Sequence, residues 1–354
     1  MGFLRYRAGA RAQEILRSKG FDAARIGAVV GPASGPKWLV LAGIDHVLMD
    51  DGLLDGAPGH RPLLVGASAG AWRMLAMASR RPRETHRALL DLYISQVFDR
   101  QHTPQIISAA YRDMLEQLFP EEEMQHILNH SAVDVGVHVT RPRGGRWMGR
   151  RPMQLGQLLL AMALCRVHRH GVGTFFEGIL LHSAPGRMAR AFDGRLETLD
   201  ARNFLAASMA TGSVPMYLEP VGTLAGLGPG PYVDGGVTDY HLNRPYVGAE
   251  DDRIVVLPHY QERIAPTWFD KHREGRRPPA EHLDSVLQLY PSEEFVQGLP
   301  GGRIPDRDEF QTFMDAPDER LRRWREAAAL SERLGEELSR DLESGRWVDR
   351  LESF

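Results

Sequence analysis

A serine held between two glycines, at the end of an apolar run, is the feature that most constrains this chain. Residues 63–66 are apolar, Ser68 lies between Gly66 and Gly70, and residues 71–77 are compatible with a helix. This succession predicts a strand, a tight turn and a helix with the serine at the apex, the arrangement called a nucleophile elbow. Side chains at the two glycine positions would collide across such a turn. The alternative is an ordinary loop, because the pattern also arises by chance.

A second passage of the same kind precedes the serine. Residues 25–30 form a largely apolar run typical of a buried strand. A loop with glycine and proline follows at 31–37, and residues 38–49 are predicted to form a helix. Such a loop presents backbone N–H groups that suit an anion. By itself it reads as a plain strand-to-helix connection, but the nearby serine favours an oxyanion role, because a nucleophile needs donors from a neighbouring loop.

The composition argues against several classes of protein. A net charge of −3 argues against nucleic acid as a general partner. The single cysteine, Cys165, excludes an intramolecular disulfide and a zinc site built from cysteines. The longest apolar run, residues 155–165, is shorter than the roughly 20 residues that span a bilayer, and no signal peptide is apparent. These features predict a soluble, cytoplasmic protein.

One loop is both basic and rich in glycine. Residues 141–151 contain several arginines around Trp147. Arginine and tryptophan both suit a membrane interface, so this loop could give the protein a peripheral contact with anionic head groups. The competing interpretation is a solvated hairpin tip.

The remaining segments alternate between helical and strand-like patterns. Helices are predicted at 10–18, 83–98, 104–118, 121–129, 153–170 and 318–342, and strands at 131–140, 176–183, 196–199, 228–234 and 254–257. The stretch 266–317 is rich in proline and is predicted to be irregular, with one helix near 281–289.

A catalytic serine needs a base, and two arrangements are open. In the order Ser…Asp…His, Asp234 would act with His241 or His259. Alternatively Asp234 takes the proton of Ser68 directly, since the two glycines after it allow close approach. The ordinary pKa of aspartate lies about 2.6 units below that of histidine, which makes the transfer about 3.5 kcal/mol more uphill, and burial would narrow this gap. Asp234, Asp239 and His241 could in principle bind a metal, but no further ligand set converges, so no metal is expected.

Four short motifs, taken in order, resemble those of the patatin-like phospholipases, serine acyl hydrolases that use a Ser–Asp dyad. They are the loop 33–37 with its basic end, the serine motif 66–70, an Ala-Ser…Pro segment at 207–215 and the Asp-Gly-Gly motif 234–236. The resemblance covers about residues 25–260. Each motif is weakly specific alone, and the set gains its weight from its order.

The resemblance implies an α/β fold with three layers, α/β/α, around a central and mostly parallel sheet. The helical spacing of apolar residues in 318–342 adds a C-terminal helical extension. It implies a patatin-like acyl hydrolase domain over residues 1–262. Residues 263–354 would then form an irregular insertion and a helix packed on the same body.

By the same resemblance, Ser68 is the nucleophile and Asp234 is the base, while the amides of Ser34, Gly35 and Ala69 hold the oxyanion. The implied reaction is hydrolysis of carboxylic ester bonds in lipids through an acyl-serine intermediate. This chemistry needs neither a metal nor an organic cofactor.

The first motif departs from the family pattern. The family has a run of glycines where this chain has Ala33 and Ser34, followed by Pro36, which carries no N–H. Fewer oxyanion donors would follow, and the loss of one donor costs about 10²–10³ in kcat. The family's basic position is matched by Lys37, whose charge would either lie near the anionic intermediate or serve a structural pairing.

Three alternatives remain at this stage. The same dyad would also support an acyltransferase or a thioesterase, because an acyl-serine can be intercepted by acceptors other than water. The altered loop would fit a catalytically impaired module that binds lipid or protein. A hydrolase that depends on His241 or His259 is the third.

Overall fold

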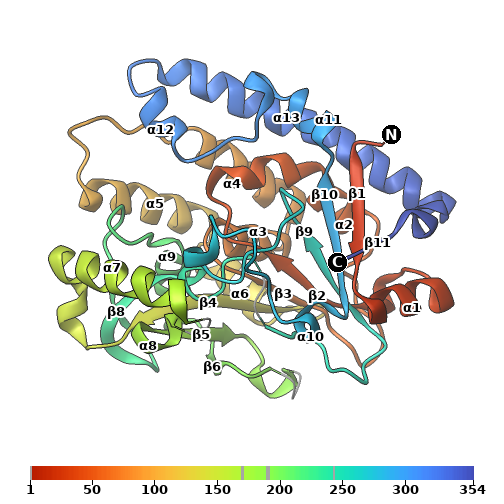
Figure 1. Cartoon of the computed structure of the whole chain (residues 1–354), viewed down its shortest axis with the longest axis horizontal. Coiled ribbons are helices and arrows are strands. Elements are labelled where there is room, and N and C mark those ends of the chain that lie inside the picture. Colours follow the sequence, from red (N-terminus) through yellow and green to blue (C-terminus); the bar gives the residue numbers. More distant parts are fainter. Residues whose placement is uncertain (1, 169–170, 189–191, 242–243) are drawn as a thin grey trace.

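A mostly parallel sheet runs through the centre of the protein (Figure 1). The computed structural model describes residues 2–168, 171–188, 192–241 and 244–354. The strand order is β11-β1-β10-β9-β2-β3-β4-β5-β6, and β8 pairs with both β4 and β7. The strands are β1 (Leu4–Ala8), β2 (Ile26–Gly31), β3 (Leu63–Gly66), β4 (Asp134–Pro142), β5 (Phe176–His182), β6 (Arg195–Thr198), β7 (Val221–Leu224), β8 (Gly228–Asp234), β9 (Ile254–Pro258), β10 (Val286–Pro291) and β11 (Glu352–Ser353).

Helices fill most of the remaining chain, and α13 crosses the top of the view in Figure 1. They are α1 (Ala10–Lys19), α2 (Ala42–Asp50), α3 (Ala69–Met77), α4 (Pro82–Ile94), α5 (Pro104–Leu118), α6 (Glu121–Leu128), α7 (Arg151–Val167), α8 (Val172–Phe175), α9 (Phe204–Gly212), α10 (Ala280–Leu283), α11 (Glu293–Gln297), α12 (Glu309–Thr312) and α13 (Pro317–Ser344). In the part of the chain that the structure describes, no helix combines the length and the apolar character needed to cross a bilayer.

Successive residues of the central strands enter two different cores. Val29 and Leu64 pack in a large cluster with side chains of α2, α3, α9 and α13. Their neighbours Val30 and Val65 point to the other face, because side chains alternate along a strand. The described residues that cover this second face come mostly from loops and from α10. A mixed α/β protein with a mostly parallel central sheet is thus confirmed.

The C-terminal third contributes a strand to the interior of the sheet, which the sequence does not predict. The predicted helix at 281–289 is wrong beyond α10, because β10 begins at Val286 and lies between β9 and β1. All six residues of β10 are buried, so its pattern resembles a buried helix as much as a strand. The unpredicted strand β1 pairs with it in antiparallel fashion.

Other differences concern the ends of elements. Residues 35–41 form a 3-10 helix before α2 begins, where a single helix is predicted over 38–49. Helix α7 ends at Val167, and residues 169–170 of the predicted helix 153–170 lie outside the described residues.

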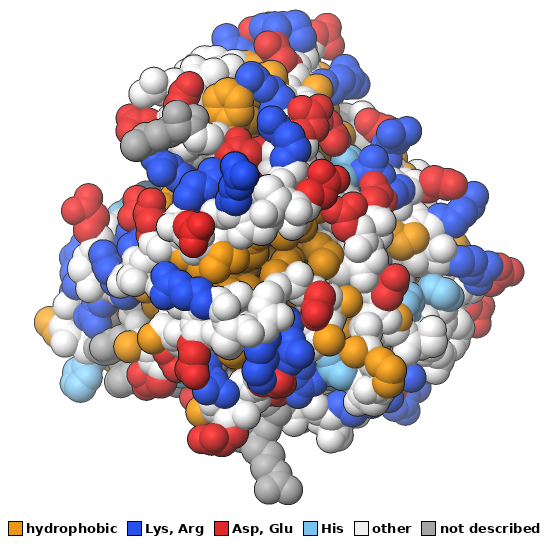
Figure 2. Space-filling model, turned by 90° about the vertical axis from the view of Figure 1, so that its right-hand side faces the viewer, with side chains coloured by type: hydrophobic (Ala, Val, Ile, Leu, Met, Phe, Trp, Pro, Cys, Tyr) orange, Lys and Arg blue, Asp and Glu red, His pale blue; other side chains and the backbone are white. Residues whose placement is uncertain are grey.

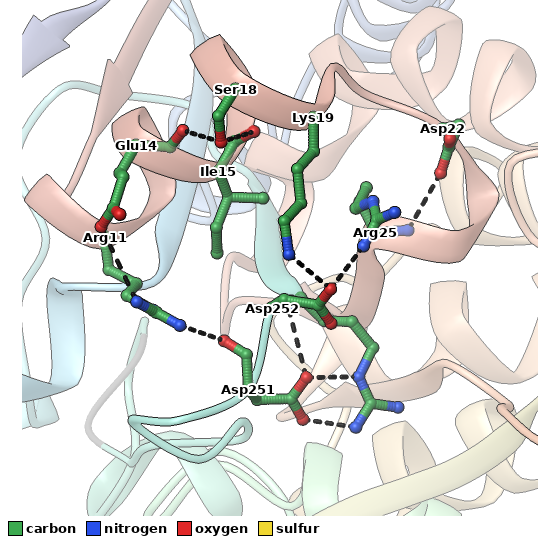
Figure 3. A network of polar contacts seen from close by, with 10 residues as sticks. Arg11, Glu14, Ile15, Ser18, Lys19, Asp22, Arg25, Asp251 and Asp252 are labelled. Carbon is green, nitrogen blue, oxygen red and sulfur yellow. Dashed lines mark hydrogen bonds and ion pairs between the residues drawn. The ribbon is translucent and has the colours of Figure 1, made fainter.

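A surface network fastens the loop before β9 to α1 (Figure 3). Lys19 Nζ and Arg25 Nη1 each lie 2.7 Å from Asp252 Oδ2. Arg11 Nη2 also donates to the carbonyl oxygen of Asp251, at 3.3 Å. Each exposed pair contributes at most about 1 kcal/mol, but together they hold the entry to β9 beside β2.

A buried polar cluster joins α2, α3 and α4 beneath the serine turn. Arg73 donates in a fork to Asp45, with Nη2–Oδ1 at 2.6 Å and Nε–Oδ2 at 2.8 Å. His86 Nε2 lies 3.0 Å from Asp45 Oδ2, and all three side chains are fully buried. Burial opposes ionisation, but the Arg73 charge and the hydrogen bonds hold the pKa of Asp45 below its ordinary value. The cluster therefore fixes α3 against its neighbours.

Candidate active site

Ser68 occupies the strained turn between β3 and α3 that the sequence predicts. Its φ is 56° and its ψ is −138°, in a region that non-glycine residues rarely adopt. A Cβ on Gly70 would lie 2.1 Å from the Gly31 oxygen, and a Cβ on Gly66 would lie 2.6 Å from the Ala71 nitrogen. Only glycine therefore lets the turn pass between β2 and α3.

The Ser68 hydroxyl donates to Asp234 at the end of β8. The Oγ–Oδ2 distance is 2.7 Å, and both side chains are buried. The other carboxylate oxygen accepts from the Gly236 N–H at 2.7 Å. A Cβ on Gly235 would lie 2.2 Å from the His138 oxygen, so this glycine lets the turn rest on β4. Burial raises the pKa of Asp234 to about 6, against the opposing effect of its two hydrogen bonds.

Three residues that line the same cavity as the serine have backbone amides that could serve an oxyanion. They are Ser34, Gly35 and Ala69, the residues predicted to form the oxyanion hole. None of these amides donates to an acceptor among the described residues. Ala69 opens α3, whose dipole adds positive potential there. Gly35 has a φ of +54°, which suits glycine. The arrangement can stabilise a negative oxygen near Ser68 even though Pro36 carries no donor.

The end of α9 holds both members of the dyad in place. Thr211 Oγ1 accepts from the Ser68 N–H at 2.9 Å, and the Ser213 carbonyl accepts from the Asp234 N–H at 2.9 Å. Trp72 Nε1 donates to the Ser208 carbonyl at 2.7 Å and so ties α3 to α9. Ser208, Thr211 and Ser213 belong to the 207–215 motif, but the sequence does not predict the separate contacts that each of them makes.

The dyad lies at the wall of a cavity of about 340 Å³. Most of its lining is apolar and comes from α7, α3 and the segment after α9. The larger apolar residues of the lining include Trp72, Leu155, Leu158, Leu159, Met162, Val214, Pro215, Met216, Leu218, Val237, Trp268 and Phe310. A cavity of this size and character suits a hydrocarbon chain.

A charged cluster forms another part of the lining. Lys37 forms an ion pair with Asp306, so the structural pairing expected as one alternative is present. Burial lowers the pKa of Lys37. Arg307 stacks on Tyr217, with its guanidinium carbon 4.5 Å from the ring centre. Its Nε is buried without a hydrogen-bond partner among the described residues. Together with Lys271, these residues give the lining three cations, and its two carboxyl groups belong to Asp306 and Asp234. No pattern in the sequence predicts that Lys271, Asp306 and Arg307 line the cavity, because they lie in the proline-rich stretch 266–317, which contains no recognisable motif.

The two histidines considered as bases have other partners. His241 Nε2 lies 2.6 Å from Tyr260 Oη, and its Nδ1 accepts from the Ala265 N–H. His259 Nδ1 accepts from the Gln261 N–H, and burial lowers the pKa of His259 to about 3. Neither histidine lines the cavity. Among the described residues, no three His, Cys, Asp or Glu side chains gather as a metal site.

No known family model matches the chain. A search of curated proteins also returns no match. The function of this site therefore has to be inferred from its geometry and chemistry.

Proposed function

We propose that the protein is a serine acyl hydrolase of the patatin-like type, with the three-layer fold of that family, and that it cleaves carboxylic esters of lipids. The observation that carries the proposal is the 2.7 Å hydrogen bond from the buried Ser68 hydroxyl to the buried Asp234 carboxylate. The unpaired amides beside Ser68 and the apolar cavity support the same conclusion.

The reaction follows from these positions. The ionised Asp234 takes the hydroxyl proton as Ser68 Oγ attacks the ester carbonyl carbon. The amides of Ser34, Gly35 and Ala69 stabilise the oxyanion that forms. When the intermediate collapses, the proton on Asp234 passes to the leaving alcohol, and the acyl group remains on Ser68. A water molecule then gives a proton to Asp234 and attacks the acyl-serine. As the bond to Ser68 Oγ breaks and the fatty acid leaves, Asp234 returns that proton to Oγ.

The lining favours esters that combine an acyl chain with an anionic group. The apolar walls suit the chain, and the three cations Lys37, Lys271 and Arg307 outnumber the two carboxyl groups of the lining, Asp234 and Asp306. The unpartnered Arg307 Nε would gain an acceptor from a phosphate oxygen. A phospholipid meets both conditions, which supports the phospholipase type over hydrolysis of neutral lipids.

Labelling with a fluorophosphonate tests the nucleophile. Intact mass spectrometry should find one adduct, on Ser68, that Ser68→Ala and Asp234→Asn abolish. Because the pKa of Asp234 is about 6, the labelling rate should rise as pH increases through that value and then level off. A folded protein that takes no adduct would refute the proposal.

The altered first loop supports one competing function, a catalytically impaired lipid-binding module. Pro36 removes a donor from this loop. In that case the protein would bind lipid without turnover, and Ser68→Ala would leave the binding unchanged.

A further inference from the structure

Helix α7 exposes large apolar side chains on its outer face. Met153, Leu160 and Val167 follow one another at intervals of seven residues and are 46%, 61% and 80% exposed. The opposite face buries residues such as Leu158 and Cys165 against the body. A surface helix of a soluble protein normally carries polar side chains on its outer face. The outer face of α7 is therefore suited to contact with something apolar.

A second stripe of α7 connects this face to the candidate active site. Leu155, Leu159 and Met162 are 47%, 56% and 37% exposed, and all three also line the catalytic cavity. They recur at helical spacing, so they form one continuous stripe along the flank of the helix. An apolar path thus leads from the outer surface to the wall that carries Ser68.

The charged side chains within this segment of the chain have one sign. Residues 141–168 contain six arginines and neither aspartate nor glutamate. Arg146 and Arg150 flank the exposed ring of Trp147, with guanidinium carbons 5.9 and 4.3 Å from its centre. None of the six arginines forms an ion pair within the described residues. By contrast, acidic and basic side chains interleave on the face shown in Figure 2, at the end of the molecule that carries α1.

Two further arginines extend the basic region at the end of α7. Arg273 and Arg276 both donate to the carbonyl oxygen of Cys165, where the last turn of the helix leaves carbonyls unpaired. Arg273 also donates to the carbonyl oxygen of Arg166 at 3.0 Å. The apolar helix therefore has cationic groups at both ends.

We propose that residues 143–167, which we call the docking surface, seat the protein on an anionic lipid bilayer with α7 lying along the interface. The exposed leucines, Met153 and Trp147 would enter the boundary between head groups and acyl chains, and the arginines would contact lipid phosphates. A second copy of the chain is a poorer occupant, because two such surfaces would bring like charges together. Docking in this way would place the mouth of the cavity against the lipid. It does not depend on whether Ser68 hydrolyses anything.

Vesicle sedimentation tests the docking surface with the full-length Ser68→Ala variant, which cannot consume the lipid. The vesicles would be phosphatidylcholine alone, or phosphatidylcholine with 30 mol% phosphatidylserine. We expect at least tenfold tighter binding to the anionic vesicles, weakened by added salt. In the same background, Leu160→Gln/Val167→Gln and Arg146→Gln/Arg150→Gln should each weaken binding about tenfold or more.

Matched variants separate the surface from general changes in polarity and charge. Val97→Gln replaces an exposed apolar residue elsewhere, and Arg87→Gln/Arg112→Gln removes two exposed arginines from α4 and α5. These controls should bind the anionic vesicles as well as the parent protein, and circular dichroism should find all variants folded. With Ser68 restored, Leu160→Gln/Val167→Gln should label with a fluorophosphonate in solution at the unaltered rate. A failure of labelling in every protein would therefore count against the proposed function, and not against docking.

Three results would overturn the docking proposal. One is equal affinity for neutral and anionic vesicles. Another is undiminished binding of Leu160→Gln/Val167→Gln and Arg146→Gln/Arg150→Gln to the anionic vesicles. The last is a concentration-dependent dimer in light scattering that Leu160→Gln/Val167→Gln abolishes, which would assign the surface to a second copy.

Discussion

Replacing Asp234 by asparagine should make the fold more stable at neutral pH, and most of this gain should disappear in acid. Burial raises the pKa of Asp234 from 3.8 to about 6, so ionising this carboxyl costs more in the folded chain than in the unfolded one. The difference corresponds to about 3 kcal/mol of folding free energy, since one pKa unit is about 1.4 kcal/mol.

The sign of the pH dependence follows from proton binding. Between about pH 4 and pH 6 the folded chain keeps the proton of Asp234, while the unfolded chain has released it. The raised pKa of Asp234 therefore contributes to the free energy of unfolding below about pH 4, and this contribution is lost as pH rises through 6. Asparagine does not titrate, so the Asp234→Asn variant does not lose this contribution. Linkage gives about 2 kcal/mol for the part of the change that falls between pH 4.5 and pH 7.5.

Urea unfolding at those two pH values measures the effect. The free energy of unfolding of Asp234→Asn minus that of the unaltered chain should increase by about 2 kcal/mol from pH 4.5 to pH 7.5. Asp113→Asn, at an exposed position of α5, is the matched control for the loss of one carboxyl group. A constant difference for Asp234→Asn, or one that falls as pH rises, would refute the reasoning.

Further substitutions test the structure around the dyad. Gly70→Ala should lower the free energy of unfolding by at least about 1–3 kcal/mol, because the added Cβ would lie 2.1 Å from the Gly31 oxygen. Gly156→Ala should instead raise the melting temperature, because a Cβ at this position of α7 meets no atom within 4 Å and alanine favours the helix. Arg73→Met should cost about 3–5 kcal/mol in denaturant unfolding by leaving Asp45 buried without its cation, and adding Asp45→Asn should recover part of the loss. Thr211→Val should cost about 1–3 kcal/mol and slow the labelling of Ser68, because the buried Ser68 N–H loses its acceptor; Thr211→Ser, which keeps the acceptor, should remain close to the unaltered protein in both measurements.

The parts of the site that depend on local chain geometry could be predicted from the sequence. The turn at Ser68 needs glycines at fixed spacing, and the strand, turn and helix that the pattern predicts are present. Asp234 lies 166 positions away from Ser68 in the chain. No periodicity relates such distant residues, so their pairing was anticipated through the order of the motifs.

The sequence does not predict the parts of the fold and of the site whose positions depend on residues far away in the chain. Strand β10 is buried on both faces, and its sequence VLQLYP is apolar on either side of Gln288, so it lacks a clear alternation that would distinguish a strand from a helix. Its place between β9 and β1 is decided by pairing across the sheet. Arg307 reaches the cavity only because the irregular segment before α12 folds over it, and no local pattern encodes that path.

The packing of α13 has a consequence for when the site can form during synthesis. The helix lies against α2 and against the 3-10 helix Gly35–Leu41, at the end of the loop after β2. Ser331 Oγ accepts from the Gly43 N–H at 3.1 Å, and the two residues are 288 positions apart. At roughly 5–20 residues per second, a ribosome needs on the order of half a minute to add that length of chain. The serine turn is therefore translated long before the helix that supports its neighbouring loop, and a half-made chain would carry Ser68 without the packing that completes its surroundings.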